Sequence, residues 1–499
     1  MQQAEQAQIG PQSDERVAGV WRTWASWLLA FLLIGAGWAL VTPVNQYPDE
    51  SDQVYRAVSV VRGEVFPHIG AYNHGTGATT NIPTTILRSS YGGPCRGIRS
   101  PGYCSTASAA AGSVTVVTSE GRNFPLYYAL VGWPSLLFPN RAGWYFMRLV
   151  SAVWCAVLLA TGALVMMSMP RRPLVLAGAM LVGLTPLALD LSGSVNPSGL
   201  EAASALCFWA VLLALIHNNS ALDRRLVVSF GLISGVVLAT CRSLGWLWVV
   251  LAVVLSLASV GRADRLFFLR SRAARVILGG AAGAVVVAEA WSVTFHSYQV
   301  FGVGALPDGL VAAARTSLRS TPMLLQETLA YLGWLTIPPP AVAEVCWILA
   351  AVAVIVISIV TGRRTALLVA AGAALVVVLP FTILTFSFLH PRIGIWQGRY
   401  TLPLAIGVPL LGFARSRLGR GEHRIAVLLA SCAILLVLWA QLAVYRGAST
   451  IFAPLTHYWY ASFGQELLAF GALGLLANIA WADIRWSLAG HKRLPAGGA

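Results

Sequence analysis

Long apolar segments recur along most of this chain, and each approaches the length of a membrane-spanning helix. They begin near Trp24, end near Trp486 and contain few charged residues. About 20 apolar residues cross the hydrocarbon core of a bilayer as a helix, and a helix satisfies its own backbone hydrogen bonds there. A hydrophobic share of 57% with only 11% charged residues supports the same class. We therefore predict an all-α polytopic membrane protein.

Twelve segments fit such helices. They cover residues 24–42, 144–168, 173–190, 199–217, 226–241, 244–260, 275–295, 342–360, 365–387, 401–414, 425–444 and 464–484. The stretch from Asn123 to Asn140 is not counted, because Pro125, Pro134 and Pro139 break its short apolar run. We expect that stretch to lie in the outer interface. The first segment lacks a small-residue cleavage site, so we expect a retained anchor and not a removed signal peptide.

The charges of the loops predict the orientation of these helices. Cytoplasmic loops of membrane proteins are enriched in Arg and Lys. With twelve spans, twenty of the 34 basic residues fall on one side: Arg16, Arg22, Arg171, Arg172, Arg224, Arg225, Arg262, Arg265, Arg270, Arg272, Arg275, Arg363, Arg364, Arg415, Arg417, Arg420, Arg424, Arg485, Lys492 and Arg493. The net charge of +15 is thus assigned to topology and lipid contact, and not to binding of nucleic acid.

This orientation predicts cytoplasmic tails at residues 1–23 and 488–499. Residues 24–487 would form the transmembrane domain, with long extracytoplasmic loops at 43–143 and 296–341. The first loop is rich in Gly, Thr and Ser at 75–85 and 106–118, which predicts irregular structure and short strands in place of a packed independent domain. Heavy use of Arg and Ala is typical of a GC-rich bacterium, so we expect a bacterial plasma membrane.

Two of the seven cysteines, Cys95 and Cys104, lie in this first loop beside several Gly and Pro residues. Their spacing permits a small disulfide in an oxidising compartment. Two free thiols are the alternative. The other five cysteines fall in or at the predicted spans, and we expect them to be small packing residues.

An acidic motif, Tyr47-Pro48-Asp49-Glu50-Ser51-Asp52-Gln53, follows the first predicted span. A charged side chain at bilayer depth costs at least ~2.5 kcal/mol, so adjacent acids beside the membrane favour a function over packing. We predict that Asp49 and Glu50 form the edge of an active site. For Glu50, a helix N-terminal acid that interacts with the helix dipole is the alternative.

Motifs of soluble enzymes are missing from the sequence: it contains no P-loop, no dinucleotide-binding Gly pattern, no HExxH and no nucleophile elbow. His296, His390 and His457 also lack the clustered spacing of a metal site. Without a nucleotide site, an enzyme that acts outside the membrane needs an activated donor that reaches it there. Lipid-phosphate-linked substrates meet this requirement.

Further motifs follow in a defined order relative to the spans. They are Phe124-Pro125-Leu126-Tyr127-Tyr128, Met147-Arg148-Leu149-Val150-Ser151-Ala152, Leu184-Thr185-Pro186, Ser194-Val195-Asn196-Pro197, Arg242-Ser243-Leu244-Gly245, Gly333-Trp334, Pro338-Pro339-Pro340 and Gln397-Gly398-Arg399-Tyr400. With the acidic motif, this set resembles the GT-C superfamily of lipid-phosphate-sugar-dependent glycosyltransferases over residues 40–405. It most resembles a bacterial multi-pass family of poorly assigned function whose first loop reads Pro-Asp-Glu.

The chain departs from that family pattern at two positions. Gln53 stands where the pattern usually has His, and Ser198 stands where it often has Asp. Both substitutions replace an ionisable side chain by a neutral one. We consider Asp52, Asp190 and Glu201 as acids that compensate.

The resemblance implies a GT-C-like bundle of about 12 helices and an inverting reaction. A sugar would pass from a polyprenyl-phosphate donor to an extracytoplasmic cell-envelope glycan or lipid. Asp49 would be the catalytic base, with Glu50 orienting it or the acceptor. Arg399, Arg242 and Arg148 would hold the donor phosphate, although each also fits a span-end residue that reaches lipid headgroups. The need for a divalent cation is left open.

Glu289 lies inside a predicted span and is a further candidate, with pairing to one of these arginines as the alternative. Two other functions also stay open. A polymerase or ligase of lipid-linked glycans would rely on outward Arg and His without Asp49. A transporter should show internal repeats and mid-span charges, and we find no convincing repeat.

Overall fold

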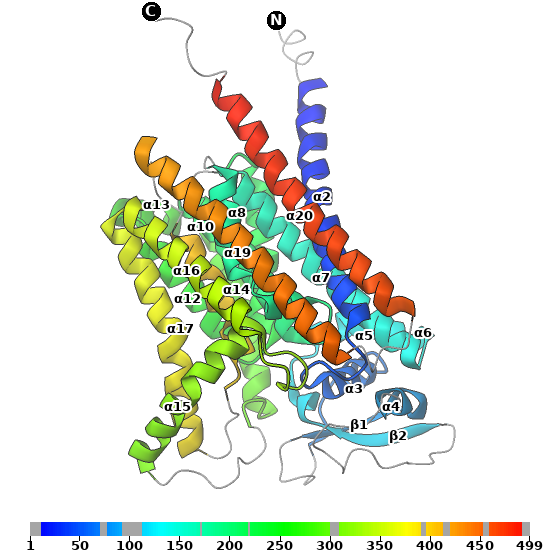
Figure 1. Cartoon of the computed structure of the whole chain (residues 1–499). Coiled ribbons are helices and arrows are strands. Elements are labelled where there is room, and N and C mark those ends of the chain that lie inside the picture. Colours follow the sequence, from blue (N-terminus) through cyan, green and yellow to red (C-terminus); the bar gives the residue numbers. More distant parts are fainter. Residues whose placement is uncertain are drawn as a thin grey trace, which may run out of the picture.

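The computed structural model describes residues 11–69, 77–91, 112–169, 172–217, 220–299, 309–390, 396–412, 420–452 and 459–491. These residues form a bundle of long helices with a small layer of short helices and two strands at one end (Figure 1). The predicted all-α polytopic fold is confirmed.

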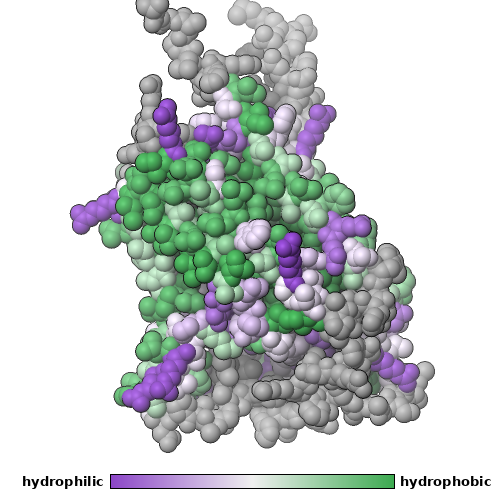
Figure 2. Space-filling view, in the orientation of Figure 1, coloured by the Kyte–Doolittle hydropathy of each residue, from purple (hydrophilic) through white to green (hydrophobic). Residues whose placement is uncertain are grey.

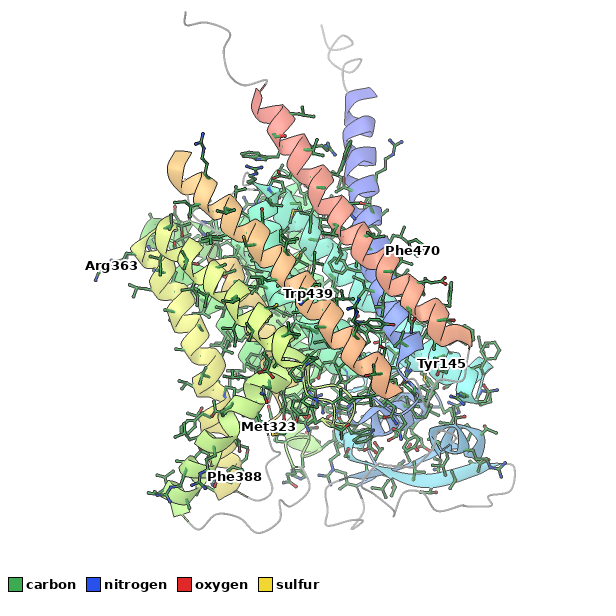
Figure 3. The ribbon with its side chains drawn as sticks, viewed as in Figure 1. Tyr145, Met323, Arg363, Phe388, Trp439 and Phe470 are labelled. Atoms are coloured by element: carbon green, nitrogen blue, oxygen red, sulfur yellow. The ribbon has the colours of Figure 1, made fainter. Side chains whose placement is uncertain are left out.

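Nine helices in the described residues are long and apolar enough to cross a membrane. They are α2 (Pro11–Val41), α7 (Arg141–Met167), α10 (Pro197–Ile216), α11 (Arg224–Cys241), α14 (Arg272–Thr294), α16 (Ala341–Thr361), α17 (Arg363–Leu389), α19 (Arg420–Phe452) and α20 (Trp459–His491). Figure 2 shows a broad apolar band with hydrophilic residues toward both ends. On the outward faces of α19 and α20, Trp439 and Phe470 point away from the bundle (Figure 3). Such a band is what the hydrocarbon core of a bilayer requires.

The other three predicted spans form shorter or broken helices. Helices α8 (Pro173–Gly183) and α9 (Pro186–Ser192) are bent by 77° at the residues between them. Helix α12 (Gly245–Ala258) has 14 residues, and α18 (Leu402–Leu411) has 10. At 1.5 Å per residue, α18 covers only about 15 Å. The predicted count of twelve spans is therefore not confirmed, because the described residues support nine, or ten if the bent pair is one span.

Local sequence explains where the chain breaks around α9. The Thr185 hydroxyl accepts a hydrogen bond from the Ala188 amide and caps α9, and Pro186 takes the first helical position. Asn196 caps α10 through the Ser198 amide, and Pro197 follows it. A capping side chain followed by Pro begins a helix and prevents the preceding helix from continuing.

Helix α10 lies at the centre of the bundle, and all 20 of its residues are buried. It packs against α7, α11 and α18. A Cβ atom on Gly407 of α18 would lie 2.0 Å from Cε2 of Trp209 in α10, so only glycine permits this approach. The Trp209 indole donates a hydrogen bond to the Pro403 carbonyl at 3.1 Å. These contacts hold α18, and with it the residues that precede it.

The small layer at one end of the bundle comes mainly from the first long loop. It contains α3 (Glu50–Val60), β1 (Ala78–Pro83), α4 (Thr84–Tyr91), β2 (Ser113–Thr118), the 3-10 helix η3 (Ser119–Arg122), α5 (Leu126–Gly132) and α6 (Pro134–Leu137). Strands β1 and β2 pair antiparallel, with Ala78 opposite Thr118. They fall in the two stretches rich in Gly, Thr and Ser, which confirms the predicted short strands. Helix α15 (Gly309–Ala330), from the second long loop, lies at the same end of the molecule (Figure 1).

The segment from Asn123 to Asn140 forms two short helices, α5 and α6, as its three prolines predict. Trp133, Leu137 and Phe138 in this segment are exposed. A broken, apolar and exposed segment agrees with an interfacial location, which stays a prediction.

The described cysteines Cys155, Cys207, Cys241, Cys346 and Cys432 are free, and all but Cys432 are buried. Burial agrees with their predicted packing role. Cys95 and Cys104 lie outside the described residues, so their disulfide stays a prediction.

Hydrogen bonds tie several helix ends together at the end of the bundle opposite the strands. The His217 ring, after α10, lies 2.9 Å from the Ser259 hydroxyl, after α12. Arg364 at the start of α17 donates to the Ala258 carbonyl at 2.8 Å. Helix α2 begins and α20 ends at this same end, where α13 (Arg262–Arg270) also lies and where Arg363 points outward (Figures 1 and 3).

Candidate functional site

The loop between α2 and α3 is the meeting point of the sequence motifs. The Pro48 carbonyl accepts hydrogen bonds from the side-chain amide of Asn196 at 3.0 Å and from the Arg399 guanidinium at 3.3 Å. The Trp334 indole donates to the Asn45 carbonyl at 2.8 Å. The tertiary structure thus brings motifs together that lie hundreds of residues apart in the chain.

Asp49 is turned toward the 3-10 helix η4 (Gly398–Thr401) by its backbone conformation. It is the N-cap residue of α3 with φ of 57°, and its side chain makes no capping hydrogen bond. A left-handed non-glycine residue costs roughly 1–3 kcal/mol and is common at functional sites. The Asp49 carboxylate forms an ion pair with Arg399 instead. The side chain of Asp49 is 26% exposed and that of Arg399 only 2%, so this pair has one accessible partner.

The backbone around Arg399 is held by the last turn of α15. The Gly398 amide donates to Glu327 at 2.7 Å, and the Thr328 hydroxyl donates to the Gly398 carbonyl at 3.1 Å. A Cβ atom on Gly398 would lie 2.4 Å from the Thr328 backbone nitrogen. Only glycine fits here, so Gly398 fixes the approach of η4 to the last turn of α15.

Arg242, which follows α11, lies beside Arg399. The guanidinium carbons of Arg242 and Arg399 lie 4.5 Å and 5.2 Å from the centre of the Tyr400 ring. Arg242 donates one hydrogen bond, to the Ser198 hydroxyl at 3.2 Å. None of the ion pairs within the described part of the chain includes Arg242. Since a guanidinium carries five N–H donors, most of those on Arg242 are left for an anion.

Two further acids, Glu120 and Asp52, lie near Asp49 and the two arginines, and the sequence analysis predicted only Asp52. Glu120 in η3 interacts electrostatically with Arg242, Asp49 and Arg399, and burial raises its pKa. Burial, and then the charges of Asp49 and Glu120, raise the pKa of Asp52 to about 7. Asp52 was a predicted candidate. Glu120 carries no local signal, because it is a single acid after a run of Ser, Thr and Val.

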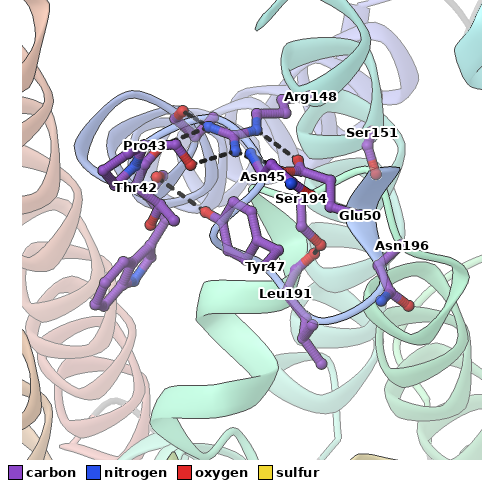
Figure 4. Close-up of polar contacts among 12 residues, drawn as sticks. Thr42, Pro43, Asn45, Tyr47, Glu50, Arg148, Ser151, Leu191, Ser194 and Asn196 are labelled. Atoms are coloured by element: carbon purple, nitrogen blue, oxygen red, sulfur yellow. Dashed lines mark hydrogen bonds and ion pairs between the residues drawn. The ribbon is translucent and has the colours of Figure 1, made fainter. Parts of the chain in front are cut away.

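Arg148 and Glu50 form a separate, fully buried ion pair (Figure 4). Nε and Nη2 of Arg148 donate to the two carboxylate oxygens of Glu50, each at 2.6 Å. Its other N–H groups donate to the carbonyl oxygens of Ala39, Thr42 and Pro43. All five donors are thus used within the protein. These contacts favour a structural role for both residues over the predicted phosphate contact of Arg148 and the predicted catalytic role of Glu50.

The remaining predicted acids lie in two places. Asp190 in α9 is buried and interacts electrostatically with the Arg148–Glu50 pair. Glu201 in the first turns of α10 is also buried and interacts with Arg242. Glu201 thus belongs to the site formed around Arg242 and Arg399, the arginine site, whereas Asp190 belongs to the buried Arg148–Glu50 pair.

Glu289 in α14 is paired with a tyrosine. The Tyr298 hydroxyl contacts the Glu289 carboxylate and also the Ser243 carbonyl at 2.8 Å. No ion pair of Glu289 with an arginine occurs among the described residues. The alternative, pairing of Glu289 with an arginine, is therefore not found among the described residues.

The chemistry available to this arrangement is that of an anion site beside carboxylic acids. Arg242 and Arg399 concentrate positive charge around the Tyr400 ring, which suits a phosphate. Asp49, Asp52 and Glu120 supply groups that exchange protons. No set of three or more His, Cys, Asp or Glu side chains in the described residues could hold a metal ion.

Comparison with known proteins gives one match. Neither a curated protein nor a solved structure matches this chain. The model of one family, described as predicted membrane protein (DUF2142), matches residues 32–408. That range runs from α2 into α18 and includes every residue of the site described above. The chain therefore belongs to this family of predicted membrane proteins (DUF2142).

Proposed function

We propose that this protein is an integral membrane glycosyltransferase. It transfers a sugar from a polyprenyl-phosphate donor to a cell-envelope glycan or lipid outside the cytoplasm, as its resemblance to the GT-C superfamily implies. Its proposed partners are membrane lipids and the lipid-linked donor, and we do not propose binding of nucleic acid.

Arg242 is the observation that carries this proposal. Its guanidinium carbon lies 4.5 Å from the centre of the Tyr400 ring, and the group donates only to the Ser198 hydroxyl. Glu120 and Glu201 interact with it electrostatically, but it forms no ion pair within the described residues. A guanidinium with several unused N–H donors in a partly buried site favours an anionic ligand. Arg399 lies on the same ring and adds a second positive charge. A phosphate that leaves the anomeric carbon gains charge on its oxygens, and two fixed guanidinium groups stabilise that charge.

The position of the site agrees with a lipid-linked donor. Asp49, which binds Arg399, precedes α3, and α3 lies at the end of the bundle that carries β1 and β2 (Figure 1). The Arg-rich helix α13 lies at the other end. Arg-rich loops favour the cytoplasmic side, so the location that we propose for the site is the outer leaflet or beyond it.

Binding of a polyprenyl phosphate tests the anion site directly. We would titrate the protein in nanodiscs with a C50 polyprenyl phosphate and follow complex formation by native mass spectrometry. The uncharged polyprenol of equal length is the ligand control. Arg242→Gln should weaken phosphate binding at least about tenfold, which corresponds to about 1.4 kcal/mol. Arg446→Gln, at an exposed arginine near the end of α19, is the matched control and should bind like the wild type.

Mass analysis of envelope glycans in a deletion strain tests the reaction. The strain should lack a defined sugar on one glycan or lipid, and the wild-type gene should restore it while Arg242→Gln should not. Equal binding of phosphate and polyprenol, together with unchanged glycans, would contradict the proposal.

A further inference from the structure

Asp49 is poorly placed to act as the only base of the site, because its carboxylate already binds Arg399. The ion pair joins Oδ2 of Asp49 to Nη2 of Arg399, and Arg399 also donates to the Pro48 carbonyl of the same loop. Protonation of Asp49 would weaken the contact that holds Arg399. The geometry therefore suits Asp49 to positioning Arg399, and the reaction needs another proton acceptor.

Glu120 is held close to this pair with one oxygen unoccupied. The Glu120 amide donates to the Thr118 hydroxyl at 3.2 Å, and that hydroxyl donates to the Asp52 carbonyl at 2.9 Å. Asn123 donates to Oε2 of Glu120. Oε1 of Glu120 makes no hydrogen bond with the described residues. A carboxylate with a free oxygen can accept the proton of a hydroxyl group that comes within hydrogen-bond distance of it.

A chain of hydrogen bonds supports Glu120 from behind. Asn123 donates its second N–H to the Tyr128 hydroxyl at 2.9 Å, and Tyr128 donates to Oε1 of Gln53 at 2.6 Å. Burial, and then the charge of Glu120, raise the pKa of Tyr128, so this hydroxyl stays protonated and keeps the direction of the chain. Gln53, the neutral residue at the unusual position of the acidic motif, is thereby connected to Glu120.

Asp52 lies next to Glu120 and is bound to the same turn. The Ser119 hydroxyl donates to Oδ2 of Asp52 at 3.0 Å. The charged groups that interact with these two acids are Asp49, Arg242 and Arg399. Two neighbouring carboxyl groups that repel each other hold a proton near neutral pH more readily than either alone. A base whose pKa lies near the working pH is also the most effective one.

We propose that Glu120 accepts the proton of the acceptor hydroxyl and that Asp52 shares it; this assignment rests on the proposed glycosyl transfer. The acceptor oxygen forms a bond to the anomeric carbon of the sugar, and its proton goes to Oε1 of Glu120. The bond between that carbon and the phosphate oxygen breaks, and the electron pair leaves with the polyprenyl phosphate beside Arg242. The proton then passes from the Glu120 and Asp52 pair to water.

Infrared titration of the protein in nanodiscs, without any substrate, tests the shared proton. From about pH 5 to about pH 9 we would follow the C=O stretch of protonated carboxyl groups. In the wild type this band should lose intensity near pH 7, and the part of that loss that comes from Asp52 should be absent in Asp52→Asn, as the difference between the two titrations. Glu120→Gln should move that loss to lower pH, because one neighbouring negative charge is gone. Glu64→Gln is the matched control, since Glu64 is bound by Thr80 and Asn81 away from the pair. If no band near pH 7 changes in both variants, the proposal that Glu120 and Asp52 share a proton is wrong.

Complementation of the deletion strain tests the role in turnover. Glu120→Gln should lower transfer roughly 10²- to 10⁴-fold while binding of the C50 polyprenyl phosphate stays at the wild-type level. Glu120→Asp should recover part of the transfer, and Glu64→Gln should restore the glycan fully. Full restoration by Glu120→Gln would overturn the assignment. If deletion leaves every glycan unchanged, the glycosyl transfer itself fails and the role of Glu120 in it fails too, while the infrared titration still decides whether the two acids share a proton.

Discussion

At the scale of single residues, Asp49 and Glu50 are neighbours in the sequence with different environments. Glu50 is fully buried and bound by two nitrogens of Arg148, whereas Asp49 is partly exposed and bound by Arg399. The left-handed conformation of Asp49 separates the two side chains. Adjacent acids that look equivalent in the motif thus have different roles, one in the fold and one in the site.

Loss of the Glu50 charge should destabilise the protein more than loss of the Asp49 charge. Glu50→Gln leaves the Arg148 guanidinium buried without a counter-ion, which costs about 3–5 kcal/mol. In Asp49→Asn, water reaches the exposed side of the pair and replaces part of the lost contact. Thermal unfolding of both variants in nanodiscs measures the difference. Equal losses would mean that the two pairs are energetically alike.

The raised pKa of Asp52 predicts a pH dependence of stability. An Asp in an unfolded chain has a pKa of about 3.9, and in the folded protein the pKa of Asp52 is raised to about 7. Its contribution is fully present below about pH 4 and is lost as the pH rises through 7, because the unfolded state ionises first. Asp52→Asn removes this loss. The melting temperature of the variant relative to the wild type should therefore be higher at pH 7.5 than at pH 4.5.

At the scale of elements, the short helices decide where the site lies. Helix α18 ends after 10 residues, and α8 bends into α9 at Leu184 and Thr185. Hydropathy alone does not separate such helices from complete spans, because their residues are as apolar as those of α10. Their ends bring Arg399 and Asn196 to the loop of Asp49.

Substitution of Gly407 should disturb α18 and the site together. In Gly407→Ala the new methyl group would collide with the Trp209 ring, and overpacking of this kind costs typically about 1–3 kcal/mol. Gly283→Ala in α14 is the matched control, because a Cβ there meets nothing within 4 Å. It should be neutral or slightly stabilising, since Ala favours a helix over Gly. Thermal unfolding and binding of polyprenyl phosphate measure both effects, and a neutral Gly407→Ala would show that α18 moves freely.

At the scale of the whole molecule, the bundle has two chemically different ends. One end carries α13 and the beginnings or ends of α2 and α20, and the other carries the strands and the arginine site (Figure 1). Nine or ten full spans are found among the described residues, and α2 begins and α20 ends on one side, as the twelve-span topology requires. The short helices α12 and α18 contribute to this by returning the chain between the two ends.

Single cysteines placed at the two ends should react differently in intact cells. Ser113→Cys, in exposed β2, should be labelled by a membrane-impermeant maleimide, and Asp264→Cys, in exposed α13, should not. The expected difference follows from the excess of Arg on the α13 side. Because the protein has cysteines of its own, the measured quantity is the increase in labelling over the protein without either substitution. Labelling at residue 264 in intact cells would invert the topology and place the site in the cytoplasm.

The sequence by itself determined the class of this protein and much of its local structure. Hydrophobic length is a property of consecutive residues, so the described part of every predicted span is helical, although span 173–190 is broken into α8 and α9. The caps at Thr185 and Asn196 act on residues two or three positions away. The Gly, Thr and Ser composition of the first loop likewise predicted the short strands. Asp49, Asp52, Arg242 and Arg399 were predicted site residues, and the structure brings these four together.

Only the tertiary structure decided which charges are partners and which are free. Arg148 and Glu50 are 98 residues apart, and Arg399 and Asp49 are 350 residues apart. Pairings over such distances in sequence depend on how complete helices pack. The direction of the Asp49 side chain depends on its left-handed backbone conformation, which the residue type does not reveal. Glu120 joined the site for the same reason. Its neighbours in sequence do not reveal that the fold of the first loop places it beside Arg242.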